Sequence, residues 1–323
     1  MPAPSTTVTT LRPDLAGSME EYPIRNAKLG AIANEVFVPI DVALQADTYG
    51  RIPIEEYLQV LETRRASGAG YSRDDFNFIE DSYACQEHGL EGVVDDRDAK
   101  RYKSYFDAEL KQTERKDFQV TLAQEVRVSA MLMNATTFSG QTTAMGTALT
   151  NYSSSTPVTK VEAACQAVYN RTGIWPNTLV MNNIAKRNLR HNAEVISRIT
   201  SSGAGDQARQ ADITIEQLSQ VFDLPNILVG GMASNSANRG QAASISSAWP
   251  DAYMMVGFID HSGDIQAPSL TRAFHWSEDG SQIGGAIESY REDNKRSTII
   301  RVRNDVVQKI EYKELGQLIT GVV

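Results

Sequence analysis

The stretch from Asp95 to Met133 decides the fold, and it reads DDRDAKRYKSYFDAELKQTERKDFQVTLAQEVRVSAMLM. It contains no Gly or Pro and is rich in good helix formers, and its two opening aspartates can accept hydrogen bonds from the free N–H groups of a first helical turn. At about 1.5 Å per residue, one helix over this stretch would be roughly 60 Å long. The stretch therefore predicts a single long helix that serves as a spine.

Apolar residues follow two narrow lines on this predicted helix, each with a spacing of four residues. The expected packing residues are Tyr102, Phe106, Leu110, Phe118, Leu122 and Val126. Charged side chains fill most other positions of the first half, so we expect the helix to lie on one layer of structure with its other side in solvent. A coiled coil is the alternative, but Thr113, Glu114 and Asp117 interrupt a sustained heptad.

The composition of the chain is that of a globular protein with about two domains, since 41% of its 323 residues are hydrophobic and 22% are charged. The formal net charge of -9 disfavours a general affinity for nucleic acid or for anionic membranes. We find no basic region followed by an apolar run at the N-terminus and no long apolar stretch, so no membrane partner is expected. Cys85 and Cys165 fit reduced thiols in a cytosol-like compartment.

The part of the chain before the spine has little means of forming its own core. Residues 1–34 are polar and rich in proline, which predicts an extended arm, and residues 35–40 form a short β-prone run. Residues 50–94 then predict two antiparallel limbs joined by a charged tip that contains Gly68 and Gly70. An isolated hairpin is marginally stable in water, so we expect this one to rest on another chain.

The part of the chain after the spine alternates between helices and strands, which is typical of an α/β domain. A connector rich in Ser, Thr and Gly is followed by predicted helices and strands, which lie at 158–169, 178–181, 184–199, 213–221, 226–229, 253–257, 271–276 and 284–288. Loops are expected at 203–212 and 230–247, and a turn at 278–280. The alternating pattern of 296–312 predicts strands that close the fold.

The sequence shows no pattern that carries enzymatic chemistry. Phosphate-binding GxxxxGK[ST], HExxH, GxSxG and CxxC motifs are all absent, and the four histidines have no metal-ligand spacing. Acidic residues and His261 between Asp251 and Asp264 could form a hydrolytic or metal site, but Asp and Gly are also the usual turn formers. We therefore expect no catalytic residue, no cofactor site and no metal site.

The order of these elements resembles that of tailed-phage major capsid proteins with the Hong Kong 97-type fold. Several segments carry the resemblance, namely Tyr83–Asp95, which leads into the spine, Thr172–Met181, His191–Val195, Phe222–Gly230 and Ser289–Arg303. The resemblance implies an α+β fold with an N-terminal arm, an extended loop, a spine helix, a peripheral domain and an axial domain. The implied boundaries are 1–34 for the arm, 35–49, 95–154 and 285–323 for the peripheral domain, 50–94 for the extended loop and 155–284 for the axial domain.

The resemblance also implies a function: a shell of pentamers and hexamers that encloses double-stranded DNA without sequence-specific binding. The implied partners are a separate scaffold protein, a portal and, in some members of the family, a decoration protein. The implied location is the virion, after assembly in the host cytoplasm. The extended loop carries charges of both signs that we expect to contact a neighbouring subunit, namely Arg51, Glu62, Arg64, Arg65, Arg73, Asp74 and Asp75. Each of these contacts between subunits can be weak, because a shell repeats the same contact many times.

Two features depart from some members of that family. Residues 41–96 contain no Lys, so cross-linking of the shell through a loop lysine is not expected. The arm is also too short and too rich in proline to act as a scaffolding segment, which is why a separate scaffold is expected. Two alternatives stay open: an encapsulin-type compartment, which has the same fold and encloses protein cargo, and a soluble α/β enzyme with its site near residues 251–264.

Overall fold

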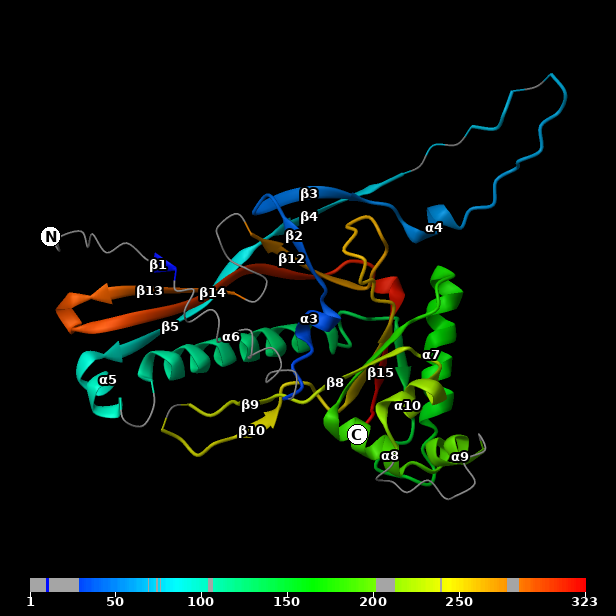
Figure 1. The fold of residues 1–323 in the computed structure, drawn as a ribbon. Coiled ribbons are helices and arrows are strands. Elements are labelled where there is room, and N and C mark those ends of the chain that lie inside the picture. Colours follow the sequence, from blue (N-terminus) through cyan, green and yellow to red (C-terminus); the bar gives the residue numbers. More distant parts are fainter. Residues whose placement is uncertain are drawn as a thin grey trace.

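A computed structural model describes residues 10–11, 29–68, 70–73, 75, 77–103, 107–201, 213–238, 240–277 and 285–323. Within these residues, two larger sheets lie side by side, a long helix runs along one of them, and a hairpin projects from the body (Figure 1). This mixture of sheets and helices confirms the predicted α+β class. Thr10–Leu11, called β1, is the described portion of the first 28 residues of the expected arm, and it pairs with residues 288–289.

The first sheet has six strands and is organised around one long strand. Its strands are β1, β13 (Ala286–Glu292), β14 (Ser297–Ile310), β12 (Thr271–Trp276), β2 (Pro39–Val42) and β5 (Gln86–Asp95). β14 pairs with β13 and β12 at two ends of one edge and with β5 along the other edge. Ile300 and Val302 are buried and pack against Ala108 and Val120 of the long helix, whereas Arg301 and Arg303 between them are half-buried, which explains the alternating pattern of the sequence.

The predicted spine is two helices instead of one. α5 (Asp96–Tyr102) is short, and α6 (Ala108–Leu132) is the long one. Asp107 interrupts them because its backbone is extended (φ -77°, ψ 116°), and its carboxylate accepts hydrogen bonds from the N–H groups of Glu109 at 2.9 Å and Leu110 at 3.4 Å. The prediction of one helix over 95–133 is therefore wrong, since an aspartate inside a run of helix formers acts as an N-cap.

The buried face of α6 is more polar than the sequence predicts. It contains Thr113, Asp117, Gln124, Glu125, Val128, Ser129 and Leu132. Of the expected packing residues, Phe118 and Leu122 are half-buried against the main core, and Tyr102 and Leu110 are half-buried. Val126 is 40% exposed, so its assignment to packing within the subunit is wrong, while Phe106 lies outside the described residues.

The second sheet has five strands and carries helices on one face. Its strands are β6 (Thr142–Ala144), β15 (Gly316–Thr320), β11 (Tyr253–Gly257), β7 (Thr178–Asn182) and β8 (Asn226–Gly230). Its helices are α7 (Pro157–Thr172), α8 (Asn183–His191), α9 (Ala193–Ser201) and α10 (Ile215–Phe222). As predicted, Pro157 opens α7 and Gly173 ends it with a positive φ of 66°.

Three local predictions are corrected in these regions. Residues 184–199 form two helices because Asn192 has an extended backbone and its Oδ1 accepts a hydrogen bond from Glu194 N at 2.9 Å. The run at 35–40 begins as the helical turn α3 (Ala33–Val36), and the strand starts only at Pro39. The expected loop at 230–247 contains a small hairpin of β9 (Ala233–Asn235) and β10 (Ile245–Ser247). The loop at 203–212 and the turn at 278–280 lie outside the described residues.

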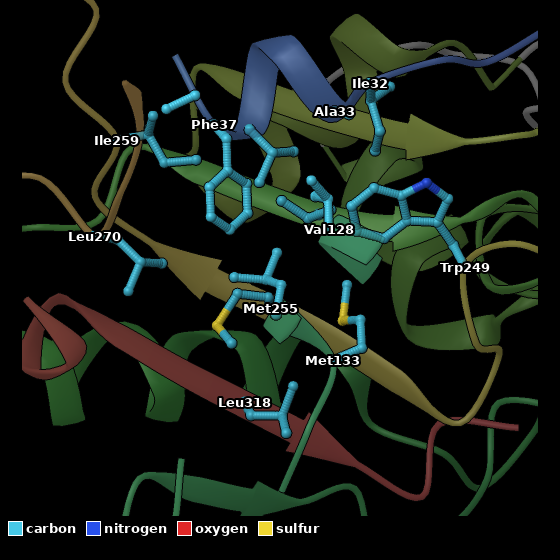
Figure 2. Close-up of a cluster of buried hydrophobic side chains, with 14 of the residues drawn as sticks. Ile32, Ala33, Phe37, Val128, Met133, Trp249, Met255, Ile259, Leu270 and Leu318 are labelled. Carbon is cyan, nitrogen blue, oxygen red and sulfur yellow. The ribbon is translucent and has the colours of Figure 1, made fainter. Parts of the chain in front are cut away.

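The two sheets exchange strands across the expected domain boundaries. β12 lies within 155–284 but belongs to the six-stranded sheet, and β15 lies within 285–323 but belongs to the five-stranded one. A single hydrophobic core joins both sheets and α6, as Figure 2 shows for Phe37, Val128 and Leu318. The boundaries at 284 and 285 therefore do not follow the packing, because the C-terminal segment returns to the second sheet.

A buried carboxylate fastens the start of α3 to α6. Glu125 is 1% exposed, and its Oε1 accepts hydrogen bonds from the N–H groups of Ile32 at 2.8 Å and Ala33 at 2.6 Å. Its Oε2 accepts a hydrogen bond from Trp249 Nε1 at 2.6 Å. Burial raises the pKa of Glu125, and these three hydrogen bonds act in the opposite direction. Ile32 at the N-cap of α3 has no capping side chain of its own, and Glu125 accepts the hydrogen bonds of that turn instead. Glu125 thereby ties α3 to both α6 and Trp249.

Candidate functional site

The hairpin that projects from the body is the feature that best fits a role in assembly (Figure 1). Its limbs are β3 (Ala46–Arg51) and β4 (Ile79–Ala84), paired antiparallel from Ala46 opposite Ala84 to Arg51 opposite Ile79. The paired part begins at residue 46, before the predicted boundary at residue 50. We call β3 and β4 together the loop root. A short helix, α4 (Ile54–Tyr57), follows β3, and we call the described residues of 59–78 the loop tip.

Aromatic rings anchor the loop root to the six-stranded sheet. The ring of Tyr83 stacks on Phe274 of β12 with centroids 4.6 Å apart, and the ring of Tyr49 lies 5.5 Å from the same Phe274. Cys85 follows β4 and donates a hydrogen bond from Sγ to the carbonyl oxygen of Phe274 at 3.3 Å. These side chains form a small buried cluster with Val42, which holds the base of the hairpin on the body.

A buried ion pair lies beneath these rings. Arg272 Nε donates to Glu311 Oε2 at 2.7 Å, and both side chains are 1% exposed. Tyr49 of the loop root donates its hydroxyl to Glu311 Oε1 at 3.0 Å. Burial raises the pKa of Glu311, while Arg272 and the Tyr49 hydrogen bond lower it. The hairpin is therefore coupled to a charge pair that is almost fully buried.

A second charged contact fixes β4. Lys309 of β14 pairs with Asp81, donates to the carbonyl oxygen of Ser82 at 2.7 Å and lies 5.3 Å from the centre of the Tyr49 ring. Burial alone would raise the pKa of Asp81, but the hydrogen bonds from Lys309 and from Ser82 N–H outweigh it, so the pKa lies below its usual value of 3.8. The root is thus held by groups on β12, β14 and the segment that follows β14.

Arg51 belongs to this root and not to the tip. Its guanidinium donates to the carbonyl oxygen of Glu311 and lies over the ring of Tyr312, 4.7 Å from the centroid. Tyr312 in turn donates its hydroxyl to the carbonyl oxygen of Ile52 at 2.9 Å. Of the residues expected to contact a neighbouring subunit, Arg51 therefore has partners within its own chain.

The remaining expected contact residues lie on the loop tip, which is exposed. Glu62, Arg64, Arg65, Arg73 and Asp75 are exposed, and Asp74 lies outside the described residues. Glu62 Oε1 accepts a hydrogen bond from Arg64 N at 2.8 Å, and the Arg65 guanidinium lies 4.7 Å from the centre of the Tyr71 ring. The structure brings these charges together on one projecting segment.

Sequence reasoning missed the apolar side chains of the same tip. The exposed fractions are 98% for Val60, 48% for Leu61, 76% for Tyr71 and 58% for Phe78. Several large apolar side chains exposed on one projecting segment are a feature that interaction surfaces often have. The signal was present in the sequence, because these residues lie in a segment that has too few apolar neighbours to form a core.

The described residues show no grouping that suggests another kind of site. Among them, no three His, Cys, Asp or Glu side chains are placed to hold a metal ion. None of the described helices combines the length and apolar character needed to cross a lipid bilayer. Cys85 and Cys165 are both buried, and burial raises the pKa of each thiol, that of Cys165 to about 12. Such thiols are poor nucleophiles at neutral pH.

Comparison with known proteins finds similar chains among phage proteins and an encapsulin. No protein-family model matches the chain. The major capsid protein of Burkholderia phage BcepMu is 26% identical over 188 residues, which cover 56% of this chain and 58% of that protein. The aligned part thus spans little more than half of that curated relative.

Solved structures cover far more of the chain. A phage-related protein from Bordetella bronchiseptica superposes with a TM-score of 0.69 at 19% identity, over 97% of this chain and 98% of the other. The capsid of the cyanophage P-SCSP1u gives a TM-score of 0.57 at 9% identity, over 88% and 86%. The encapsulin SrpI of Synechococcus elongatus gives 0.50 at 9% identity, over 90% and 87%. The resemblance inferred from the sequence is confirmed at the level of the fold: this chain has the Hong Kong 97-type fold of tailed-phage capsid proteins.

Proposed function

We propose that this chain is the major capsid protein of a tailed phage or prophage. It assembles into pentamers and hexamers, and these build a closed icosahedral shell around double-stranded DNA. The loop tip is the observation that carries the proposal, because its apolar side chains are exposed on a segment whose root is firmly held. A projecting apolar surface on a rigid base is stabilised when it lies on another copy.

The proposed role is structural and not enzymatic. Weak contacts suffice for it, since each copy repeats the same contacts around a closed shell and the contacts reinforce one another. The formal net charge of -9 also suits a container that must not bind its DNA tightly. A separate scaffold protein, a portal and a decoration protein are the further partners proposed for the virion, with assembly in the host cytoplasm.

We propose domains that follow the two sheets. The peripheral domain comprises the six-stranded sheet with α5 and α6, and the axial domain comprises the five-stranded sheet with α7 to α10. β12 then belongs to the peripheral domain and β15 to the axial domain. The extended loop comprises the loop root, α4 and the loop tip.

Imaging of the expressed chain tests the proposal. We expect closed particles with five- and six-fold capsomers in negative stain when the chain is produced with its scaffold protein. Particles of phage-head size that carry a portal vertex would support the capsid role, and uniform small shells around an enzyme cargo would support the encapsulin alternative. A chain that stays monomeric at micromolar concentration with a protected loop tip in hydrogen exchange would contradict both.

The proposed shell is held by non-covalent contacts. Residues 41–96 contain no Lys, and both thiols are buried. We therefore expect particles boiled in denaturant to run as one band near 35.5 kDa. A ladder of oligomers that survives both denaturant and reductant would show that another residue forms cross-links.

A further inference from the structure

A second exposed apolar surface lies at the C-terminal end of α7. The rings of Tyr169 and Trp175 stack there with centroids 4.6 Å apart and an interplanar angle of 16°. Their exposed fractions are 42% and 52%. Leu58, which is 52% exposed, lies against the end of the same helix, because a Cβ on Gly173 would come within 3.2 Å of its Cδ2. We call Leu58, Tyr169 and Trp175 the helix-end patch.

The border of this patch is acidic. Glu55, which is exposed, and Glu56, which is half-buried, precede Leu58 on α4. The C-terminus of α7 adds the negative end of a helix dipole. Arg171 in the last turn of α7 keeps its positive charge, but it is half-buried and its guanidinium is held by the carbonyl oxygens of Glu314 at 3.1 Å and Gly316 at 2.9 Å. The patch therefore combines an apolar centre with two carboxylates on the α4 side.

The loop tip carries the complementary features. Val60 and Tyr71 are its most exposed large apolar side chains, and Arg64 and Arg65 lie on the same segment. The Arg65 guanidinium lies over the Tyr71 ring in the unassembled chain, so an aromatic ring and a positive charge are held together as one unit before binding. Such a unit suits a surface that offers both aromatic rings and carboxylates.

We propose that the loop tip of one copy docks on the helix-end patch of a second copy, with Arg64 and Arg65 facing Glu55 and Glu56. This inference rests on the proposed shell function and specifies where the loop makes its contact. The loop does not fold back onto its own patch, since the root is anchored and the tip projects away from α7 (Figure 1). Tip and patch are different surfaces, so every copy uses both, and this head-to-tail contact can close into a ring.

A disulfide formed only between copies tests the placement directly. Arg64→Cys and Glu56→Cys are made as separate variants and assembled as a mixture, so that no single chain carries both new thiols. We expect mild oxidation of the particles to give a dimer band in non-reducing denaturing gels. The background is low because Cys85 and Cys165 are 4% and 3% exposed.

Ala163→Cys is the matched control, since it lies on the exposed side of α7 about two turns before the patch. Mixed with Arg64→Cys, it should give no dimer. Absence of a dimer from the Arg64→Cys and Glu56→Cys mixture in assembled particles would overturn the inference. An equally strong dimer with Ala163→Cys would overturn it as well, because the disulfides would then report random encounters.

A charge exchange provides the second test. Arg64→Glu with Arg65→Glu should raise the lowest protein concentration that yields particles at low salt, by about 2- to 30-fold if each pair contributes as exposed ion pairs do. Adding Glu55→Arg and Glu56→Arg to the same chain should restore assembly, because each tip meets the patch of another copy. Glu162→Arg with Glu216→Arg, two exposed sites elsewhere, gives the same change in net charge and should not restore it.

The outcomes separate this inference from the function on which it rests. If the unaltered chain forms closed particles but neither the disulfide nor the charge rescue appears, the docking site is wrong and the shell function stands. If the unaltered chain forms no particles with its scaffold protein, the shell function itself is contradicted and the docking site with it.

Discussion

The loop root and the loop tip belong to one hairpin but differ in almost every physical respect. The root lies on a buried ion pair whose members are 1% exposed, whereas Val60 on the tip is 98% exposed. Polar groups of the root find partners on β14 and at residues 311–312 of the same chain, and its tyrosine rings pack on Phe274 of β12. The apolar groups of the tip have no comparable burial. The contrast shows that the hairpin is stabilised by its own chain at the root and not at the tip. In the proposed shell, another copy covers the tip.

The largest effect is expected at the centre of the root. Arg272→Met would leave Glu311 buried without its counter-charge, and breaking one side of a buried pair typically costs about 3–5 kcal/mol. The free energy of unfolding of the unassembled chain, from urea titration followed by circular dichroism, measures the loss.

Replacing both members of the pair is the control. Arg272→Met with Glu311→Leu removes both charges and should recover part of the stability, since apolar side chains of similar size can replace a buried pair, whereas the Tyr49 hydroxyl loses its acceptor. If Arg272→Met alone lowers the stability by less than about 1 kcal/mol, the pair is more accessible to water than its burial indicates.

A smaller effect is expected at the edge of the root. Tyr312→Phe removes the hydroxyl that donates to Ile52 O but keeps the ring beneath Arg51, so a loss of about 1 kcal/mol is expected. Thermal unfolding of the variant beside the unaltered chain measures it. If the variant keeps its stability and residues 46–51 stay protected in hydrogen exchange, the hydrogen bond from Tyr312 to Ile52 O does not help to hold the root.

Acid should loosen the root from the side of β4. The pKa of Asp81 is lower in the folded chain than its usual value of 3.8, so its contribution to stability is complete above about pH 3.8 and is lost as the pH falls through the folded-state pKa. Hydrogen exchange of β3 and β4, corrected for intrinsic rates, should speed up over this range more than that of β7. Lys309→Met should reduce this dependence on pH, and an unchanged profile in that variant would refute the assignment to this pair.

The smallest effect on the isolated chain is expected at the tip. Val60→Ser changes a side chain that touches almost nothing, so the free energy of unfolding should stay within about 0.5 kcal/mol. The yield of closed particles should nevertheless fall if the tip is buried between copies. Normal assembly of this variant would show that Val60 is not part of the contact between copies. Tyr71 and Phe78 would then be the apolar residues to test next.

The sequence predicts the tip better than it predicts the root. A charged segment with Gly68 and Gly70 and few apolar neighbours indicates exposure by composition alone. The root depends instead on contacts between distant positions: Tyr49 and Glu311 are 262 residues apart, and Lys309 and Asp81 are 228 apart. One sequence does not reveal such pairs, since any arginine, lysine, aspartate or glutamate is equally plausible at the surface.

Helices are predicted well where their ends have strong signals and poorly where a polar residue interrupts them. Thr156, Pro157 and Gly173 define α7 at both ends. Asp107 and Asn192 break two predicted helices, because each side chain caps the helix that follows. The exposure of Val126 could not be inferred either, since Glu125 beside it takes the buried position that an apolar residue would normally occupy.

Glu125 also sets an order of events during synthesis. Its partners at the N-terminal side, Ile32 and Ala33, leave the ribosome first, and Glu125 follows Ile32 by 93 positions. Trp249 comes another 124 positions later. At about 5–20 residues per second, residues 32–33 therefore wait roughly ten seconds or longer before the complete set of partners exists. The complete contact therefore forms only after about three quarters of the chain has been translated.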